Sequence, residues 1–187
     1  MKRLEININD YKKYSSIEIE IKPVNNKYGK FININDNEEI YYHIYFNNNE
    51  EEIKRNYINE DEDEEIKTIK IIIDYQVMSF EDLFSDCICI KSINFTKFYR
   101  NNINDMSEMF SRCSFLKELN LNNFNTTNVT NMSCMFKGCS SWKELNLNNF
   151  NTNNVTNMSL MFNGCLDELK LKIKSQFKNI KEEAFKN

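Results

Sequence analysis

Four cysteines recur at one spacing and offer the most obvious chemistry in this chain. Consecutive members of the set lie 26 residues apart: Cys87, Cys113, Cys139 and Cys165. Thiols at a constant spacing can form disulfides, bind zinc or fill a tight core position as small apolar groups. Zinc ligands come in clustered pairs such as CxxC, and His43 is the only histidine. We therefore predict core thiols rather than a metal site.

Acidic residues offer a second possible chemistry. The run 60–65 contains only Asp and Glu, but it lacks the spaced D-x-D-x-D-G pattern of a calcium loop. A block of like charge of this kind indicates a solvated loop. The sequence has no Gly-rich phosphate loop, no G-x-S-x-G and no HExxH. We expect no catalytic residues, no cofactor and no metal, and therefore no enzyme.

Composition narrows the class of protein and of partner. A chain of 187 residues with 41% hydrophobic content allows one packed domain, or one domain with a small appendage. The net charge of −4 argues against nucleic acid, because binding phosphates requires a basic face. Asn is abundant, and we give that richness alone no functional weight.

Targeting features indicate a cytoplasmic protein, with a surface location less expected. Residues 1–7 alternate apolar with polar side chains and do not resemble a signal peptide, and no apolar stretch is long enough to span a membrane. The cysteines should then be reduced. Four glycosylation sequons begin at Asn128, Asn131, Asn154 and Asn157. In a secreted protein these sequons would receive sugars beside core residues.

A repeat of 26 residues must position the cysteines. Methionine and phenylalanine share the period, at Met106, Met132 and Met158 and at Phe110, Phe136 and Phe162. A fixed period of this length indicates stacked structural units that cannot fold alone. Apolar matches extend the pattern back to Val77, which gives four repeats: 77–102, 103–128, 129–154 and 155–175. The last repeat is two residues shorter after Cys165.

Each repeat is predicted to contain a short helix and a strand. Met132, Met135, Phe136 and Cys139 have the i, i+3, i+4, i+7 spacing of one helical face, and Gly138 can end that helix. The alternation of residues 145–147 then predicts a strand. In the shortened repeat, Leu166, Leu169 and Leu171 would take the strand positions.

The motif LxxLxLxxF…VxxMxxMFxxC, over about residues 77–175, resembles the BspA-like leucine-rich repeats. The surface-protein type with a VTNMSxMFxGC signature is the most similar. The resemblance implies an α/β leucine-rich-repeat solenoid, with a parallel sheet on one face and short helices on the other. It implies no catalytic residues, and members of that family are thought of as protein-interaction or adhesive modules.

The flanking segments are predicted to cover the two ends of the repeats. Residues 1–76 contain alternating segments that predict a β-rich N-terminal cap with antiparallel strands at 4–8, 17–21, 31–34, 40–46 and 69–71. Residues 176–187 are expected to form a C-terminal helical cap or a truncated repeat. Ile173, Phe177, Ile180 and Ala184 would share one helical face.

The outward side chains of the predicted strands are the candidate functional residues. Partners of stacked repeats commonly bind this face. In the two central repeats the set is Glu118, Asn120, Asn122, Glu144, Asn146 and Asn148, and in the last repeat it is Glu168, Lys170 and Lys172. The alternative is an ordinary solvated face, because the patch lacks the aromatic and Arg residues typical of binding hot spots. The sequence thus favours a non-enzymatic module that binds a protein of unknown identity on its strand face, with a surface or secreted adhesin-like protein as the alternative.

Overall fold

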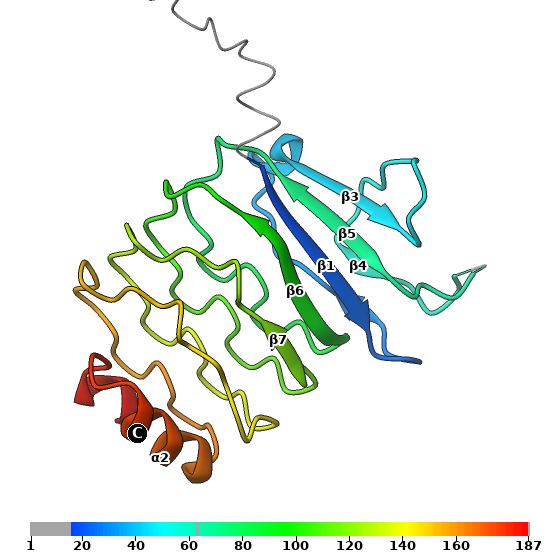
Figure 1. Cartoon of the computed structure of the whole chain (residues 1–187). Coiled ribbons are helices and arrows are strands. Elements are labelled where there is room, and N and C mark those ends of the chain that lie inside the picture. Colours follow the sequence, from blue (N-terminus) through cyan, green and yellow to red (C-terminus); the bar gives the residue numbers. More distant parts are fainter. Residues whose placement is uncertain (1–15, 63, 187) are drawn as a thin grey trace, which may run out of the picture.

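A five-stranded mixed sheet organises the molecule. The computed structural model describes residues 16–62 and 64–186 (Figure 1). The strands are β1 (Ile17–Pro23), β3 (Tyr42–Phe46), β5 (Ile69–Ile73), β6 (Ile90–Phe98) and β7 (Glu118–Asn120), in the order β3-β5-β1-β6-β7. Strand β1 is antiparallel to both β5 and β6, and β3 is antiparallel to β5, whereas β6 and β7 are parallel.

Alternating isoleucines explain the N-terminal strands. Every second residue of β1 is buried, and Ile19 pairs directly with Ile71 of β5. This period of two places one face of each strand in the core. The strands predicted at 17–21 and 69–71 are confirmed, and the strand predicted at 40–46 is confirmed from Tyr42 onward, because residues 40 and 41 lie in a 3-10 helix. Residues 31–34 form no strand, and the strand predicted at 4–8 lies outside the described residues.

Smaller elements complete the N-terminal half. Strands β2 (Gly29–Lys30) and β4 (Tyr57–Ile58) form a separate antiparallel pair, and a 3-10 helix, η1 (Glu39–Tyr41), precedes β3. The predicted boundary at residues 76 and 77 falls between β5 and β6, which both pair with β1. The N-terminal segment and the first repeat therefore contribute to a single sheet.

The repeats stack as coils joined through their turns; we call residues 77–165 the turn stack. Isolated parallel bridges link Ser79 to Asp105, Asp105 to Asn131, and Asn131 to Asn157. Some backbone N–H groups of a coil donate to a carbonyl of the same coil, and others donate to a carbonyl of the next coil. The N–H of Cys139 donates to Phe136 O in its own turn, whereas the N–H of Phe136 donates to Met161 O in the next coil, at 3.0 Å. The coils run side by side in Figure 1.

The predicted α/β leucine-rich-repeat solenoid is wrong. The described residues are mostly β and irregular, with a mixed sheet and a single α-helix, α2 (Asp167–Gln176), instead of one short helix per repeat. Residues 132–139 form consecutive turns. Two of their residues, Cys134 and Gly138, have φ of 56° and 73°, which interrupts a right-handed helix. Paired tight turns bring i, i+3, i+4 and i+7 inward just as a helix does, and this explains the error.

The strands predicted in the last two repeats are also absent. Residues 145–147 are extended but belong to no strand, and α2 replaces the strand expected around Leu169. The predicted C-terminal helical face is divided between two elements, because α2 ends at Gln176 and a 3-10 helix, η2 (Glu182–Phe185), follows.

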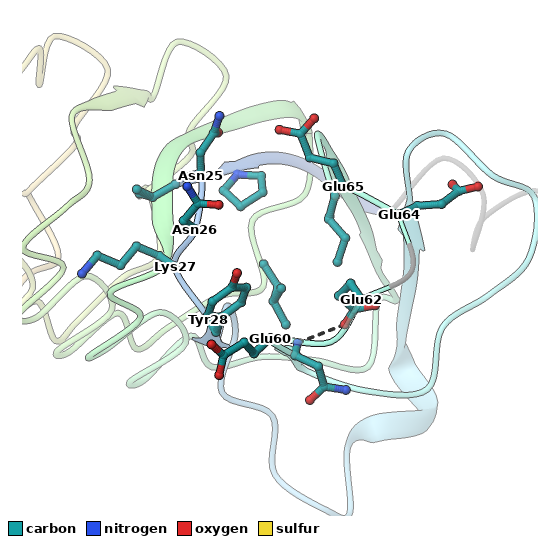
Figure 2. A pocket seen from close by; sticks show the side chains of 13 residues that line it. Asn25, Asn26, Lys27, Tyr28, Glu60, Glu62, Glu64 and Glu65 are labelled. Atoms are coloured by element: carbon teal, nitrogen blue, oxygen red, sulfur yellow. Dashed lines mark hydrogen bonds between the residues drawn. The ribbon is translucent and has the colours of Figure 1, made fainter.

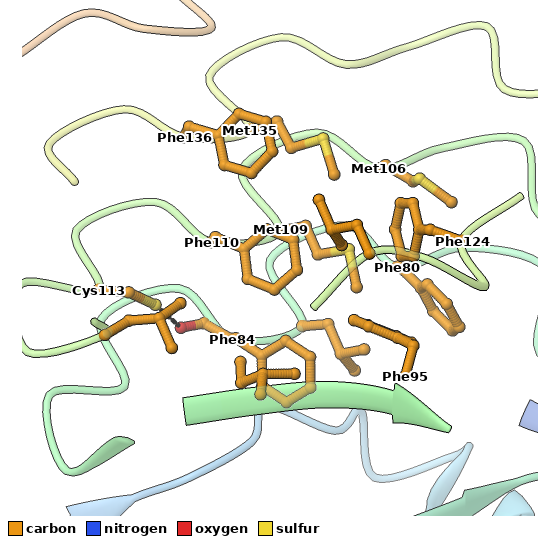
Figure 3. Close-up of a cluster of buried hydrophobic side chains, with 14 of the residues drawn as sticks. Phe80, Phe84, Phe95, Met106, Met109, Phe110, Cys113, Phe124, Met135 and Phe136 are labelled. Atoms are coloured by element: carbon orange, nitrogen blue, oxygen red, sulfur yellow. Dashed lines mark hydrogen bonds between the residues drawn. The ribbon is translucent and has the colours of Figure 1, made fainter. Parts of the chain in front are cut away.

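Stacked aromatic rings fill the centre of the turn stack. Phe84, Phe110, Phe136 and Phe162 are fully buried, and successive ring centroids lie 5.6–5.7 Å apart. Figure 3 shows the first three of these rings with their methionine neighbours. Phe185 of η2 stacks on Phe162 at 5.4 Å and extends this phenylalanine ladder by one position. The C-terminal segment thus covers the end of the core.

The four repeat cysteines also lie in this core, as predicted. All six cysteines of the chain are free, and the four at the 26-residue spacing are buried. The thiols of Cys113, Cys139 and Cys165 donate to backbone carbonyls of the preceding coil at 2.9–3.0 Å. Burial raises the pKa of the Cys165 thiol to about 11, so this group stays protonated at neutral pH.

Candidate functional site

The six predicted site residues are all exposed on two neighbouring coils. Glu118 and Asn120 lie on β7, and Asn122 follows in the next turn. The positions 26 residues later are Glu144 and Asn146, which belong to no strand, and Asn148, which lies in the turn that follows. The structure therefore places the six at equivalent positions of adjacent coils. The strand prediction was wrong for the second set of three and for Asn122, which lies outside β7.

The same local turn fixes both triplets. The Oδ1 of Asn120 accepts from the N–H of Asn122, and the Oδ1 of Asn146 accepts from the N–H of Asn148, each at 3.0 Å. An Asn side chain that bonds its own backbone two residues on stabilises a turn. Two amides of the predicted patch thus serve the fold with their oxygens and keep their N–H groups for other partners.

Helix α2 brings to this surface Lys172, which the strand prediction also placed on this face, and Gln176 and Phe177, which the sequence reasoning did not assign to it. Lys172 lies 3.1 Å from Glu144 and 3.3 Å from Glu168, and the pairing raises the pKa of Lys172. Gln176 and Phe177 follow on the same helix end. The two residues missing after Cys165 were the available signal, because they shift residues 166–172 out of the strand register of the other repeats.

A groove runs between the third coil and the end of α2. Its volume is about 410 Å³, and its lining is Glu144, Leu145, Asn146, Asn148, Lys172, Ile173, Gln176 and Phe177. Three of the six predicted site residues therefore form one wall. Ile173 is buried and Phe177 half-buried, so part of the surface is apolar. The groove combines hydrogen-bonding side chains with apolar area, the usual character of a binding site.

The acidic loop lines a different cavity, of about 260 Å³ (Figure 2). The carboxylate of Glu62 already has partners, because it pairs with Arg55 and accepts a hydrogen bond from the N–H of Asn59 at 3.0 Å. The Arg55 hydrogen bond lowers the pKa of Glu62. The labelled carboxylates do not converge on one point in Figure 2. Within residues 16–62 and 64–186, no cluster of three His, Cys, Asp or Glu side chains could hold a metal ion.

His43 has a carboxylate on each side of its ring. Its Nδ1 lies 3.1 Å from Glu52 Oε1, and its Nε2 lies 3.6 Å from Asp74 Oδ2. A metal ion bound to Nδ1 would lie on the side of Glu52, and one bound to Nε2 on the side of Asp74. The ring and both carboxylates therefore cannot bind the same ion. The His43 cluster therefore ties β3 to its neighbours and does not resemble a metal centre.

Asparagines outside the candidate surface join consecutive coils, a role that the sequence analysis did not foresee. The Nδ2 of Asn128 donates to Asn101 O at 2.9 Å, and that of Asn154 donates to Thr127 O at 2.7 Å. These bonds join consecutive coils at a fixed position of the repeat. The period of the asparagines themselves was the signal for this role.

Comparison with known proteins identifies the family. The model of a family described as "Mycoplasma protein of unknown function, DUF285" matches residues 78–184, which is more than half of the chain. No curated protein and no solved structure matches. The helices within the described ranges are too short and too polar to cross a bilayer. The turn stack together with its C-terminal covering thus coincides with the matched region, and the chain belongs to the DUF285 family.

Proposed function

We propose that this protein is a non-enzymatic module that binds a protein partner through Glu118, Asn120, Asn122, Glu144, Asn146 and Asn148. One observation carries the proposal: the six side chains are exposed at equivalent positions of two coils that share one buried core. A fixed scaffold of this kind presents side chains with little loss of entropy on binding. We further propose that the repeats are of the BspA-like type, on the strength of the VTNMSxMFxGC signature.

Substitution of the surface tests the proposal. Glu118, Asn120, Glu144 and Asn146 would be changed together to Ala, and partners would be recovered by proximity labelling in the cell of origin. The matched control changes four exposed residues of the same coils outside the patch, namely Ser114, Thr127, Ser140 and Asn153. We expect the first variant to lose the partners and the control to keep them. Equal recovery from both folded variants would refute the assignment of this surface.

We place the protein in the cytoplasm. Two observations support this: the six cysteines are free, and the exposed amides of Asn128 and Asn154 each donate to the backbone of the neighbouring coil. A glycan on either amide would replace one of its N–H groups and crowd the neighbouring coil. Protease shaving of intact cells tests the location: we expect protection equal to that of a cytosolic control.

An adhesin-like protein at the cell surface is the second candidate, favoured by the resemblance to surface-protein repeats. Selective loss of the protein on protease shaving would establish that location. Occupancy of the sequon at Asn157 would then be the next measurement, because its Nδ2 has no hydrogen bond within residues 16–62 and 64–186.

A further inference from the structure

The backbone beside the groove is left without partners. In sheets and turn stacks, nearly every backbone N–H and C=O pairs with a neighbour. The coil before this one follows that pattern, since Ile93 of β6 pairs with Leu119 of β7. Within residues 16–62 and 64–186, residues 144–146 make no backbone hydrogen bond to β7 on one side or to α2 on the other.

Helix α2 explains why residues 144–146 have no backbone hydrogen-bond partner on the side away from β7. A helix satisfies its backbone groups internally, so α2 cannot pair with the extended chain beside it. Where a fourth strand would lie, the structure has instead the groove of about 410 Å³. One wall consists of residues 144–146, with their unpaired main chain, and of Asn148 in the turn that follows. The other wall is the end of α2.

We infer that this groove binds an extended segment of a partner protein, which pairs with residues 144–146 as an added strand. The inference rests on the proposed function and specifies its partner as a peptide in extended conformation. Unpaired main-chain donors and acceptors along an extended chain are what an added strand recognises. At about 3.3 Å per residue, the three residues 144–146 can pair with a stretch of about three residues of that segment.

The lining predicts the pattern of that segment. Alternate side chains of a strand point to opposite sides. Among the lining residues, Ile173 and Phe177 are apolar, and Glu144, Lys172 and Gln176 are polar. We therefore expect apolar and polar residues to alternate in the bound segment.

The ion pair of Lys172 with Glu144 lies between the two walls of the groove. Both side chains are exposed, with relative exposures of 38% and 84%. Exposed pairs contribute little to stability, so the pair can separate when a peptide enters. Lys172 also pairs with Glu168 at 3.3 Å, so the three side chains carry one net negative charge and disfavour a strongly acidic peptide.

The test uses a display library of random dodecapeptides selected on the full-length chain. The affinity of the best peptides would be measured for the parent chain, for Gln176→Trp, which fills the groove, and for Ser175→Trp as the control. Ser175 is exposed on the same helix and does not line the groove. We expect Gln176→Trp to weaken binding about tenfold or more, and Ser175→Trp to leave it within about twofold.

Hydrogen exchange supplies the main-chain readout. The amides of residues 145–147 should exchange freely in the parent chain and become protected when a selected peptide binds. Bound peptide without this protection would refute strand addition, and failure to select a peptide, or equal affinity for both Trp variants, would refute the groove. Conversion of a dimer to a monomer by Gln176→Trp alone would assign the groove to a second copy and would also overturn the inference.

A further variant distinguishes failure of the groove assignment from failure of the proposed function. A variant with Glu118, Asn120 and Asn122 changed to Ala alters the surface without touching the groove lining. If cellular partners are lost with this variant and kept with Gln176→Trp, the proposed function stands and the groove assignment fails. If neither variant affects partner recovery, both fail.

Discussion

The phenylalanine ladder makes a quantitative prediction about what holds the coils together. Phe136 is fully buried between two parallel neighbours, with ring centroids 5.7 Å from Phe110 and 5.6 Å from Phe162. It also meets Trp142 edge-on at 5.6 Å. Replacing Phe136 by Ala removes a ring that three coils share.

The expected cost follows from burial and stacking. A buried Phe→Ala substitution costs about 3–5 kcal/mol. Aromatic pairs contribute about 0.5–1.5 kcal/mol beyond their area, so the loss should lie toward the upper end of that range. A domain of ordinary stability has only about 5–15 kcal/mol in total. Phe136→Ala should therefore bring the protein close to unfolding, whereas Phe136→Leu keeps most of the volume and should cost about 1–2 kcal/mol.

Urea unfolding followed by two probes measures the loss of stability in each variant. Trp142 is the only tryptophan and is buried beside Phe136, so its fluorescence reports on the turn stack. Far-UV circular dichroism reports mainly on the sheet, and coincident curves would indicate one cooperative unit. The control is Phe115→Ala: Phe115 is 37% exposed, and its replacement should cost about 1 kcal/mol or less. A loss below about 1 kcal/mol for Phe136→Ala, equal to the control, would refute a core continuous through the coils.

Four further predictions concern single residues or titrations. Gly164→Ala should cost at least about 1 kcal/mol by urea unfolding, because φ is 72° and the new Cβ would lie 3.3 Å from the backbone of the preceding coil. Arg100→Met should be neutral or stabilising by about 1 kcal/mol, since Arg100 is 6% exposed and its Nε and Nη2 have no partner among the described residues; a loss above about 2 kcal/mol would contradict this. An aromatic disulfide reagent at mildly alkaline pH should label Cys134 alone in the native protein, because the other five thiols are buried, and labelling of two or more thiols before unfolding would disprove it. The contribution of Cys165 to stability should be constant below the ordinary thiol pKa of 9.0 and be lost as pH rises toward 11, because burial raises the folded-state pKa of Cys165 to about 11 and the unfolded chain loses the proton first; urea unfolding at pH 8 and pH 10.5 measures the fall.

The period and the buried positions could be predicted from the sequence, because each depends only on which residues are apolar. The local conformation could not. Each coil has two left-handed positions, four residues apart. The second holds Asp86, Arg112, Gly138 and Gly164 in successive coils, and glycine marks it in two of them. The first holds Asp82, Glu108, Cys134 and Leu160, with φ between 53° and 58° and no glycine to mark it.

Stacking is the physical reason why non-glycine residues accept that backbone. A left-handed residue costs about 1–2 kcal/mol. At these positions, the N–H of Glu108 donates to Ser133 O and that of Arg112 to Lys137 O, each in the next coil. Arg112 also forms a two-point ion pair with Asp86 at the equivalent position, with distances of 2.7 and 2.6 Å. Contacts 25 or 26 residues away thus determine the conformation, and a local pattern cannot reveal them.

The candidate surface, too, could be predicted from the sequence only in part, because its shape depends on contacts between distant residues. Exposure of its six side chains followed from alternation, but the groove beside them did not, because it depends on α2. That helix has acidic residues in its first turn, an i, i+4 pair between Glu168 and Lys172, and Leu169 and Ile173 buried on one face. These features favour a helix once two residues are missing from the repeat. The helix closes the core of the turn stack with its own backbone bonds satisfied, and the extended chain at 144–146 is left unpaired. The local preference of the shortened repeat for helix thus leaves an edge with free hydrogen-bonding groups at the candidate site.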